Sequence, residues 1–96
     1  MPYIKPNDRQ RYDELIEHLV QWSKGEGVGP LNYIITRLIH MSLPPTPCYR
    51  DLNEMIGVLE CAKASLIETV VIPYEKKKMK ENGHISDLDQ EYHDEL

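Results

Sequence analysis

The sequence has 96 residues, a length that makes one domain with a single modest core. Its apolar fraction of 41% and charged fraction of 28% are typical of globular proteins and argue against a wholly disordered chain. No stretch approaches the ~18 consecutive apolar residues of a membrane-spanning helix. The first residues also lack the apolar segment of a signal peptide. We therefore expect a cytoplasmic protein with no membrane partner.

The net charge of −5 is concentrated at the C-terminal end. Residues 1–83 carry eleven acidic and eleven basic side chains, whereas residues 84–96 carry five acidic ones and no Lys or Arg. A chain without a net basic surface is poorly suited to binding DNA, so we do not expect DNA as a partner. This distribution predicts a single domain over 1–83 and an acidic, disordered tail over 84–96.

The last four residues, His93 to Leu96, spell a retention signal of the endoplasmic reticulum. Such a signal is read only on proteins already in the secretory pathway, and nothing in the sequence directs the chain there. We interpret the match as a coincidence. Cys48 and Cys61 agree with this interpretation, because their separation of thirteen residues on one predicted helix is ~20 Å, too far for a disulfide. Two free thiols fit a reducing compartment.

The first predicted helix begins at a cap provided by Asn7 or Asp8. Its apolar positions recur every three or four residues and so form one face; they are Tyr12, Leu15, Ile16, Leu19 and Val20. The segment "KGEGVGP" (24–30) then predicts a turn, because glycine dominates it. Pro30 suits the start of the next helix.

A second helix is predicted from about Leu31 to Met41, with a buried stripe formed by Leu31, Ile34, Ile35, Leu38 and Ile39. The prolines of "LPPTP" (43–47) cannot continue a helix and therefore end it. Thr46 is the predicted cap of a long third helix. Its apolar positions are Leu52, Met55, Ile56, Leu59, Ala62, Leu66 and Val70.

Pro73 is expected to kink or end this third helix, and "YEKKKMKEN" then forms a short helical extension that Gly83 terminates. No strand pattern is present in the sequence. The predicted fold is all-α: a small bundle of three helices with a long, Pro-kinked third helix and a short C-terminal extension. A third helix of ~38 Å is longer than the first two can cover. We therefore expect the chain to associate with itself as a homo-oligomer.

The second helix also has a polar side. Asn32, Thr36 and His40 recur every four residues, and Tyr33 and Arg37 form the neighbouring row. Amide, hydroxyl, imidazole and guanidinium groups can together hydrogen-bond a base or hold a phosphate. The alternative is the solvated side of an ordinary amphipathic helix.

Two pairs of carboxylates, Glu14 with Glu17 and Asp51 with Glu54, are spaced three residues apart on the first and third helices. Such pairs can hold Mg²⁺ between helices, as in all-α nucleotide pyrophosphohydrolases of the MazG kind. Ordinary surface carboxylates near helix starts explain the same pattern, and we predict no metal or other cofactor. No histidine, serine or cysteine stands in a recognisable nucleophile motif, so a nucleophilic hydrolase is not expected.

The stretch "PYEKKKMKENG" (73–83) combines a possible stacking ring, positive charge and an amide in one short helix. Tyr74, Lys77 and Asn82 are the residues in it that we predict to contact a ligand, with lysines of two chains converging on a phosphate. A solvated helix end, or a partner for the acidic tail, are the alternatives.

Four stretches in order, "PYIKPNDRQRYDELI", "LNYIITRLI", "IGVLECAK" and "PYEKKKMKENG", resemble a family of small, largely uncharacterised proteins of bacteriophages and bacterial mobile elements. The resemblance covers residues 2 to about 83 and implies a bacterial host. The resemblance also implies that the family stresses the following residues: Asn32, Tyr33, Thr36, Gly57, Glu60, Lys63, Pro73, Tyr74, Glu75, Asn82 and Gly83.

These observations predict a homo-oligomeric protein that captures a phosphorylated small ligand, namely a nucleotide, between subunits. By analogy of size and origin, it would be a phage-encoded sponge for a host defence signal. One alternative is a protein-interaction module or inhibitor that docks a host protein through the third helix. The other is the Mg²⁺-dependent pyrophosphohydrolase.

Overall fold

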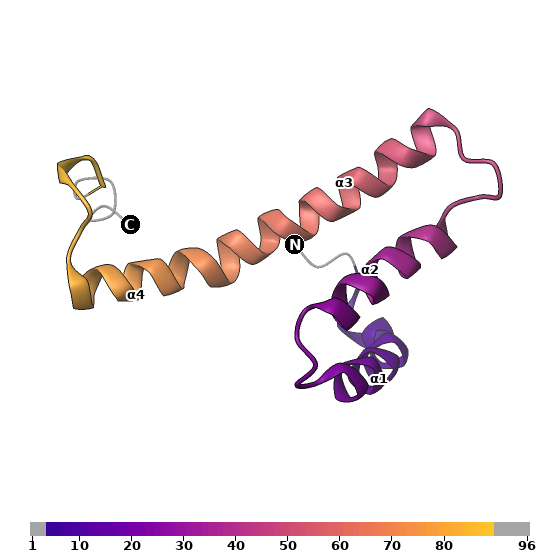
Figure 1. Cartoon of the computed structure of the whole chain (residues 1–96), viewed down its shortest axis with the longest axis horizontal. Helices are drawn as coiled ribbons and strands as arrows, with labels where there is room; N and C mark the ends of the chain where they lie inside the picture. Colours follow the sequence, from indigo (N-terminus) through magenta and orange to yellow (C-terminus); the bar gives the residue numbers. More distant parts are fainter. Residues whose placement is uncertain (1–3, 90–96) are drawn as a thin grey trace. The chain divides into compact units, whose positions relative to one another are not determined.

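The computed structural model describes residues 4–89. The helical elements are α1 (Pro6–Ser23), α2 (Gly29–Ser42), α3 (Tyr49–Leu66), the π-helical turn η1 (Ile67–Val71) and α4 (Ile72–Asn82), as Figure 1 shows. No strand occurs in residues 4–89, which confirms the all-α class. The described part holds four α-helices and not the predicted three. The chain divides inside α3 into two compact units, Met1–Met55 and Ile56–Leu96, which are treated separately below.

Helix α1 begins earlier than the sequence predicts. Pro6 occupies its first turn, where a fixed φ favours the helix and the missing N–H costs nothing. The N–H of Asp8 donates to the carbonyl of Lys5 over 2.9 Å, so Asn7 and Asp8 lie within the first turn and are not caps. At the other end, Gly25 and Gly27 adopt φ of 83° and 80°, a backbone conformation that glycine reaches without strain. The predicted glycine turn is therefore confirmed.

Helix α2 begins at Gly29, with Pro30 in its first turn, and ends at Ser42 before the proline-rich loop. The Oγ of Ser42 donates to the carbonyl of Leu38 over 2.7 Å, and Leu43 continues in an extended conformation. The helix is thus one to two residues longer at each end than the pattern predicts. Its predicted position and its termination by "LPPTP" are both confirmed.

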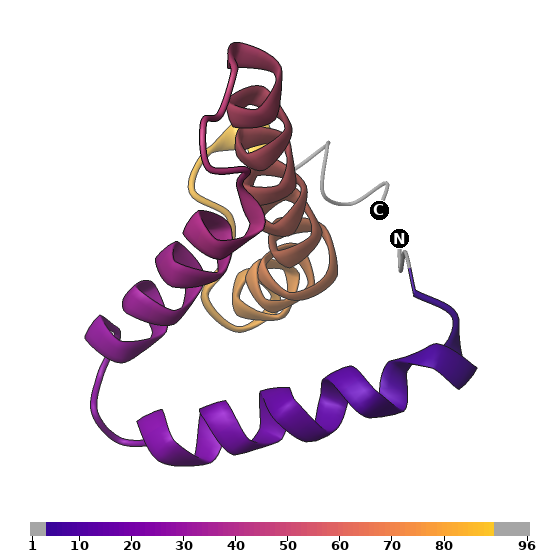
Figure 2. The ribbon, with the colours of Figure 1, turned by 90° about the vertical axis from the view of Figure 1, so that its right-hand side faces the viewer.

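The apolar faces of α1 and α2 do not close into a core within the first unit. The two helices diverge from the turn that joins them (Figure 2). Leu15 is 66% exposed and Leu38 55% exposed, although both lie on the faces that the sequence predicts to be buried. No residue in the described part of the chain is buried. The predicted bundle of three helices is therefore not confirmed.

Helix α3 begins at Tyr49, later than the predicted Thr46 cap. The N–H of Cys48 donates to Oδ2 of Asp51 over 2.9 Å, which is one half of a capping box. The carbonyl of Cys48 accepts from the N–H of Leu52 over 3.2 Å. Cys48 therefore precedes the helix and does not share it with Cys61. Both thiols are free and exposed.

Pro73 does not end the helix, and the kink predicted at this residue is not confirmed. The helical conformation is unbroken from residue 49 to residue 82, and the turn before the proline is π-helical. In this turn the N–H of Ile72 donates to the carbonyl of Ile67, five residues back. A wider turn accommodates the proline ring, which in a regular α-helix would meet the carbonyl of Thr69. α4 is consequently a direct continuation of α3 and not a separate extension.

Gly83 ends α4 as predicted. Its φ of 85° and ψ of 172° belong to a region that is nearly restricted to glycine, and its N–H donates to the carbonyl of Met79 over 2.8 Å. The next residues form a second cap: the Asp89 carboxylate accepts from the N–H groups of Ile85 and Ser86, each over 3.1 Å. The part of the tail up to residue 89 is therefore tied by hydrogen bonds. The HDEL stretch lies outside the described residues.

Candidate functional site

The predicted ligand-binding residues of α2 lie on one exposed side of that helix. Asn32, Tyr33, Thr36, Arg37 and His40 are all exposed, and the Tyr33 side chain is 67% exposed. Within the described part of the chain, none of their side chains makes a hydrogen bond or ion pair with another residue of the protein. Their donors, acceptors and aromatic face all remain accessible to a ligand.

The predicted residues of α4 lie in a different setting, since the polar groups of this helix contact each other. Lys78 donates from Nζ to Oε2 of Glu81 over 3.2 Å. The same ammonium lies 5.7 Å from the ring centre of Tyr74, within cation–π range. Lys77 and Asn82 are exposed on the same helix. Tyr74 therefore already has a cation at its ring, although 59% of the residue remains exposed.

The two sets of residues fall into different units of the chain, α2 in Met1–Met55 and α4 in Ile56–Leu96. The structure brings Asn32, Thr36 and His40 together on one helix, and it brings Tyr74 and Lys78 together on another. The joint pocket that the sequence suggests stays a prediction.

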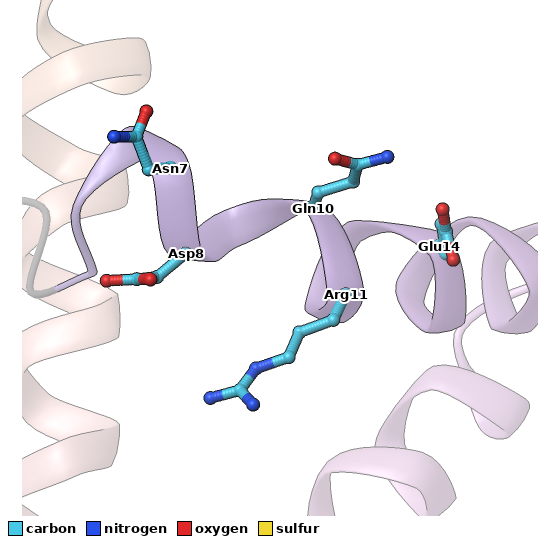
Figure 3. A pocket seen from close by; sticks show the side chains of 5 residues that line it. All are labelled: Asn7, Asp8, Gln10, Arg11 and Glu14. Atoms are coloured by element: carbon cyan, nitrogen blue, oxygen red, sulfur yellow. The ribbon is translucent and has the colours of Figure 1, made fainter.

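A polar hollow that the sequence reasoning did not single out lies along the first turns of α1 (Figure 3). All the side chains that line it come from this one helix; they are Asn7, Asp8, Gln10, Arg11 and Glu14. Their spacing of three and four residues could have identified them as one polar face. The Arg11 guanidinium stacks over its neighbour Tyr12, with 5.0 Å between Cζ and the ring centre. With walls from a single helix, the hollow is open surface and offers no enclosed site.

Two of the four carboxylates considered as Mg²⁺ ligands, both on α3, have other contacts. Asp51 accepts the N–H of Cys48, and Glu54 lies 3.6 Å from Nε of Arg50 in an exposed pair one helical turn apart. Among residues 4–89 no group of three or more His, Cys, Asp or Glu side chains has a geometry that could hold a metal ion. The contacts of Asp51 and Glu54 belong to the start of α3 and do not favour the pyrophosphohydrolase alternative.

No helix in the described part of the chain is long and apolar enough to cross a membrane. Comparison with known proteins gives one finding on relationship: the model of the family described as a domain of unknown function, DUF6899, matches residues 1–85. The chain belongs to this family. No curated protein and no solved structure shows significant similarity to it. The match spans α1 to α4 and both units, and it stops just after Gly83, where the resemblance seen in the sequence also ends.

Proposed function

We propose that the protein is a homo-oligomeric binding protein that captures a phosphorylated small ligand, and that this ligand is a nucleotide. The single observation that carries the proposal is the polar side of α2. Five exposed residues with complementary recognition chemistry lie there at helical spacing, and among residues 4–89 no hydrogen bond or ion pair occupies their side chains.

The chemistry of this side matches the parts of a nucleotide. The Arg37 guanidinium presents a planar fork of donors that suits a phosphate and keeps its charge at every relevant pH. Thr36 and Asn32 add hydroxyl and amide groups that can hydrogen-bond a base edge or a sugar. The exposed ring of Tyr33 offers a face on which a base can stack, an interaction typically worth about 1–3 kcal/mol per base.

A single exposed helix cannot enclose a ligand, because binding sites are generally concave and bury most of the ligand surface. The remaining wall would come from α4 of a neighbouring copy. Lys77 and Asn82 are the groups of α4 that we assign to the phosphate and to the polar edge of the ligand. Lys78 is less suited to this role, since it already contacts Glu81 and Tyr74.

In biological terms we propose a sponge that removes a nucleotide signal of host defence, encoded by a bacteriophage. This role rests on the resemblance to small phage proteins and on the absence of a nucleophile motif in the sequence, and it requires binding without turnover.

Isothermal titration calorimetry against a nucleotide panel that includes cyclic and ADP-ribose species tests the proposal. We expect heat with at least one member of the panel, and recovery of that nucleotide unchanged after denaturation of the protein. Absence of heat with every member would contradict the proposal of nucleotide binding. Recovery of a hydrolysed product would show an enzyme in place of a sponge.

A second candidate function, a module that docks a host protein through the third helix, is favoured by a different observation. Ile56 is 57% exposed, Leu66 55% and Val70 56%, so the second unit presents apolar side chains to solvent. Affinity purification from host lysate, followed by mass determination of the intact complex, tests it. A stoichiometric host protein and no bound nucleotide is the outcome that this function requires.

A further inference from the structure

The helix of the second unit carries an apolar seam with the spacing of a two-helix interface. Ile56, Leu59, Leu66 and Val70 occupy it at intervals that alternate between three and four residues, with Lys63 at the one remaining position. This is the seven-residue repeat of helices that pack along their length. The structure makes the whole segment helical, from α3 into η1. Ile56, Leu59 and Leu66 share one side of α3, whereas Val70 lies in the π turn, which shifts it relative to the repeat.

The seam is uncovered within its unit. Its apolar members are between 43% and 57% exposed, and Ile67, which widens the seam on one side, is 40% exposed. α3, η1 and α4 follow each other as one continuous helix, and the other helical residues in the described part of this unit are 87–89. An isolated helix is marginal in water and gains most of its stability from packing of its apolar face.

We propose that this seam packs against the same seam of a second copy of the chain, in antiparallel orientation about a two-fold axis close to Cys61. The inference rests on the homo-oligomer of the proposed function and names the surface that forms it. In this arrangement Ile56 of each copy lies opposite Leu66 of the other, and Leu59 lies opposite Lys63.

The seam contains one residue that selects a particular alignment of the two copies. A single lysine at such a position specifies the register at some cost in stability. Lys63 therefore explains why one alignment of two copies is preferred over its neighbours.

Charge decides the orientation. A parallel pair would place the two Lys63 ammonium groups opposite each other at the same level. The antiparallel pair instead places each Lys63 next to Glu60 of the second copy, so the dimer contains two pairs of opposite charges.

The lysines of α4 point to the same orientation. In a parallel pair, Lys76, Lys77, Lys78 and Lys80 of the two copies would lie side by side. About an axis at residue 61, the two Lys77 residues are separated by ~48 Å along the helices. The antiparallel pair thus leaves each α4 free of its counterpart and available to other contacts.

Pro73 and the π turn mark the end of the seam. The next seam position after Val70 falls on Pro73, where a proline stands in place of a packing side chain. The extra residue in the turn η1 rotates α4 relative to the repeat of α3. Packing between copies is therefore confined to residues 56–66, the part of the seam that is symmetric about residue 61.

Analytical ultracentrifugation of the full chain over a wide concentration range tests the interface. We expect the wild-type mass to be that of a dimer or a multiple of it, and Leu66→Asp to raise the dissociation constant at least 100-fold. Val58→Asp is the matched control, because Val58 is 53% exposed on the same helix but off the seam. A wild type that stays monomeric at all concentrations overturns the proposal, as does a control that dissociates as readily as Leu66→Asp.

A variant that is expected to strengthen the dimer tests the interface without the risk that lost association reflects misfolding of the variant. Lys63→Leu completes the apolar seam and should lower the dissociation constant at least tenfold, with helicity by circular dichroism at least that of the wild type. Weaker association of Lys63→Leu than of the wild type would contradict the assignment of this position to the seam.

Orientation is measured by electron paramagnetic resonance on Glu75→Cys, spin-labelled in a Cys48→Ser, Cys61→Ser background. The antiparallel pair predicts ~42 Å between the two labelled positions along the helices. A parallel pair would bring them to roughly the 8–10 Å that separates packed helix axes, plus the label length. Short distances overturn the antiparallel arrangement. A dimer with the expected distance but no nucleotide binding would sink the proposed function and leave this interface intact.

Discussion

Helices α2 and α4 were both predicted to contribute to one ligand site, and the structure shows them to be unlike. The polar side of α2 has no intramolecular partner for Arg37 or Tyr33 in the described residues, whereas α4 pairs Lys78 with Glu81 and with Tyr74. A group that already has a partner must lose it, or share it, before it binds a ligand. We therefore propose that α2 recognises the ligand and that α4 has a secondary, electrostatic role.

The largest effect is expected from Arg37→Ala. Charge-assisted hydrogen bonds contribute about 1.5–3 kcal/mol each, so loss of the guanidinium should weaken nucleotide binding by roughly 10–100-fold. Lys77→Ala should weaken it only by a few-fold, because a solvated ammonium acts mainly through screened charge. Calorimetry with the nucleotide identified in the panel measures both.

Arg50→Ala is the control for this comparison, since Arg50 is an exposed arginine of the same unit that pairs with Glu54. It should bind as the wild type does. If Lys77→Ala cost more affinity than Arg37→Ala, the assignment of recognition to α2 would be wrong.

The ends of the helices give the second prediction. Gly83 ends α4 at a φ of +85°, where any other residue is strained, so Gly83→Ala should destabilise the protein by about 1–3 kcal/mol. Gly57 lies inside α3 and a Cβ there would meet nothing within 4 Å, so Gly57→Ala should stabilise by about 1 kcal/mol. Chemical denaturation of the two variants at one protein concentration measures both signs.

The same pair of glycines tests an interpretation of the sequence. A glycine inside a helix suggests close packing against another helix, but among the described residues of its own unit nothing lies within 4 Å of a Cβ at Gly57. If Gly57→Ala destabilised the protein as much as Gly83→Ala does, a partner would have to contact Gly57. That result would move the contact between copies to another side of α3.

Local rules predicted most of the fold. The glycines of "KGEGVGP", the prolines of "LPPTP" and Gly83 place the ends of α1, α2 and α4 to within about two residues, because each acts through its own backbone geometry. The caps of α1 and α3 were predicted wrongly. Several polar residues stand near each start, and the sequence does not reveal that Asp51 reaches back to Cys48.

The effect of Pro73 could not be predicted from the proline alone. A proline inside a helix removes one hydrogen bond and clashes with a carbonyl, so a kink or a helix end is expected from the sequence. In the structure a π turn relieves the clash and keeps the helix continuous. Prediction of the candidate site from the sequence is limited in the same way. Helical spacing groups Asn32, Thr36 and His40 correctly on one side, since it needs only one helix, but it carries no information about which distant residues face them.

The smallest effect concerns the cap that follows α4. The N–H of Ser86 holds the pKa of the Asp89 carboxyl below its usual value of 3.8, and the N–H of Ile85 adds to this against a partial desolvation that raises it. A carboxyl whose pKa is lower in the folded state than in the unfolded state stabilises the fold when the pH is above the unfolded-state pKa. This contribution is lost as the pH falls through the folded-state pKa. The cap should therefore persist at neutral pH and be lost only below about pH 3.8.

Nuclear magnetic resonance titration of the Asp89 side-chain carbonyl carbon measures this midpoint directly. Ser86→Pro removes the donor that matters most, so its Asp89 midpoint should move up toward 3.8. In Asp89→Asn, the amide proton of Ile85 should lose its pH-dependent shift in the same range. A wild-type midpoint at or above 3.8 would show that the carboxylate does not hold this cap in solution, and α4 would then end at Gly83 without the second set of hydrogen bonds.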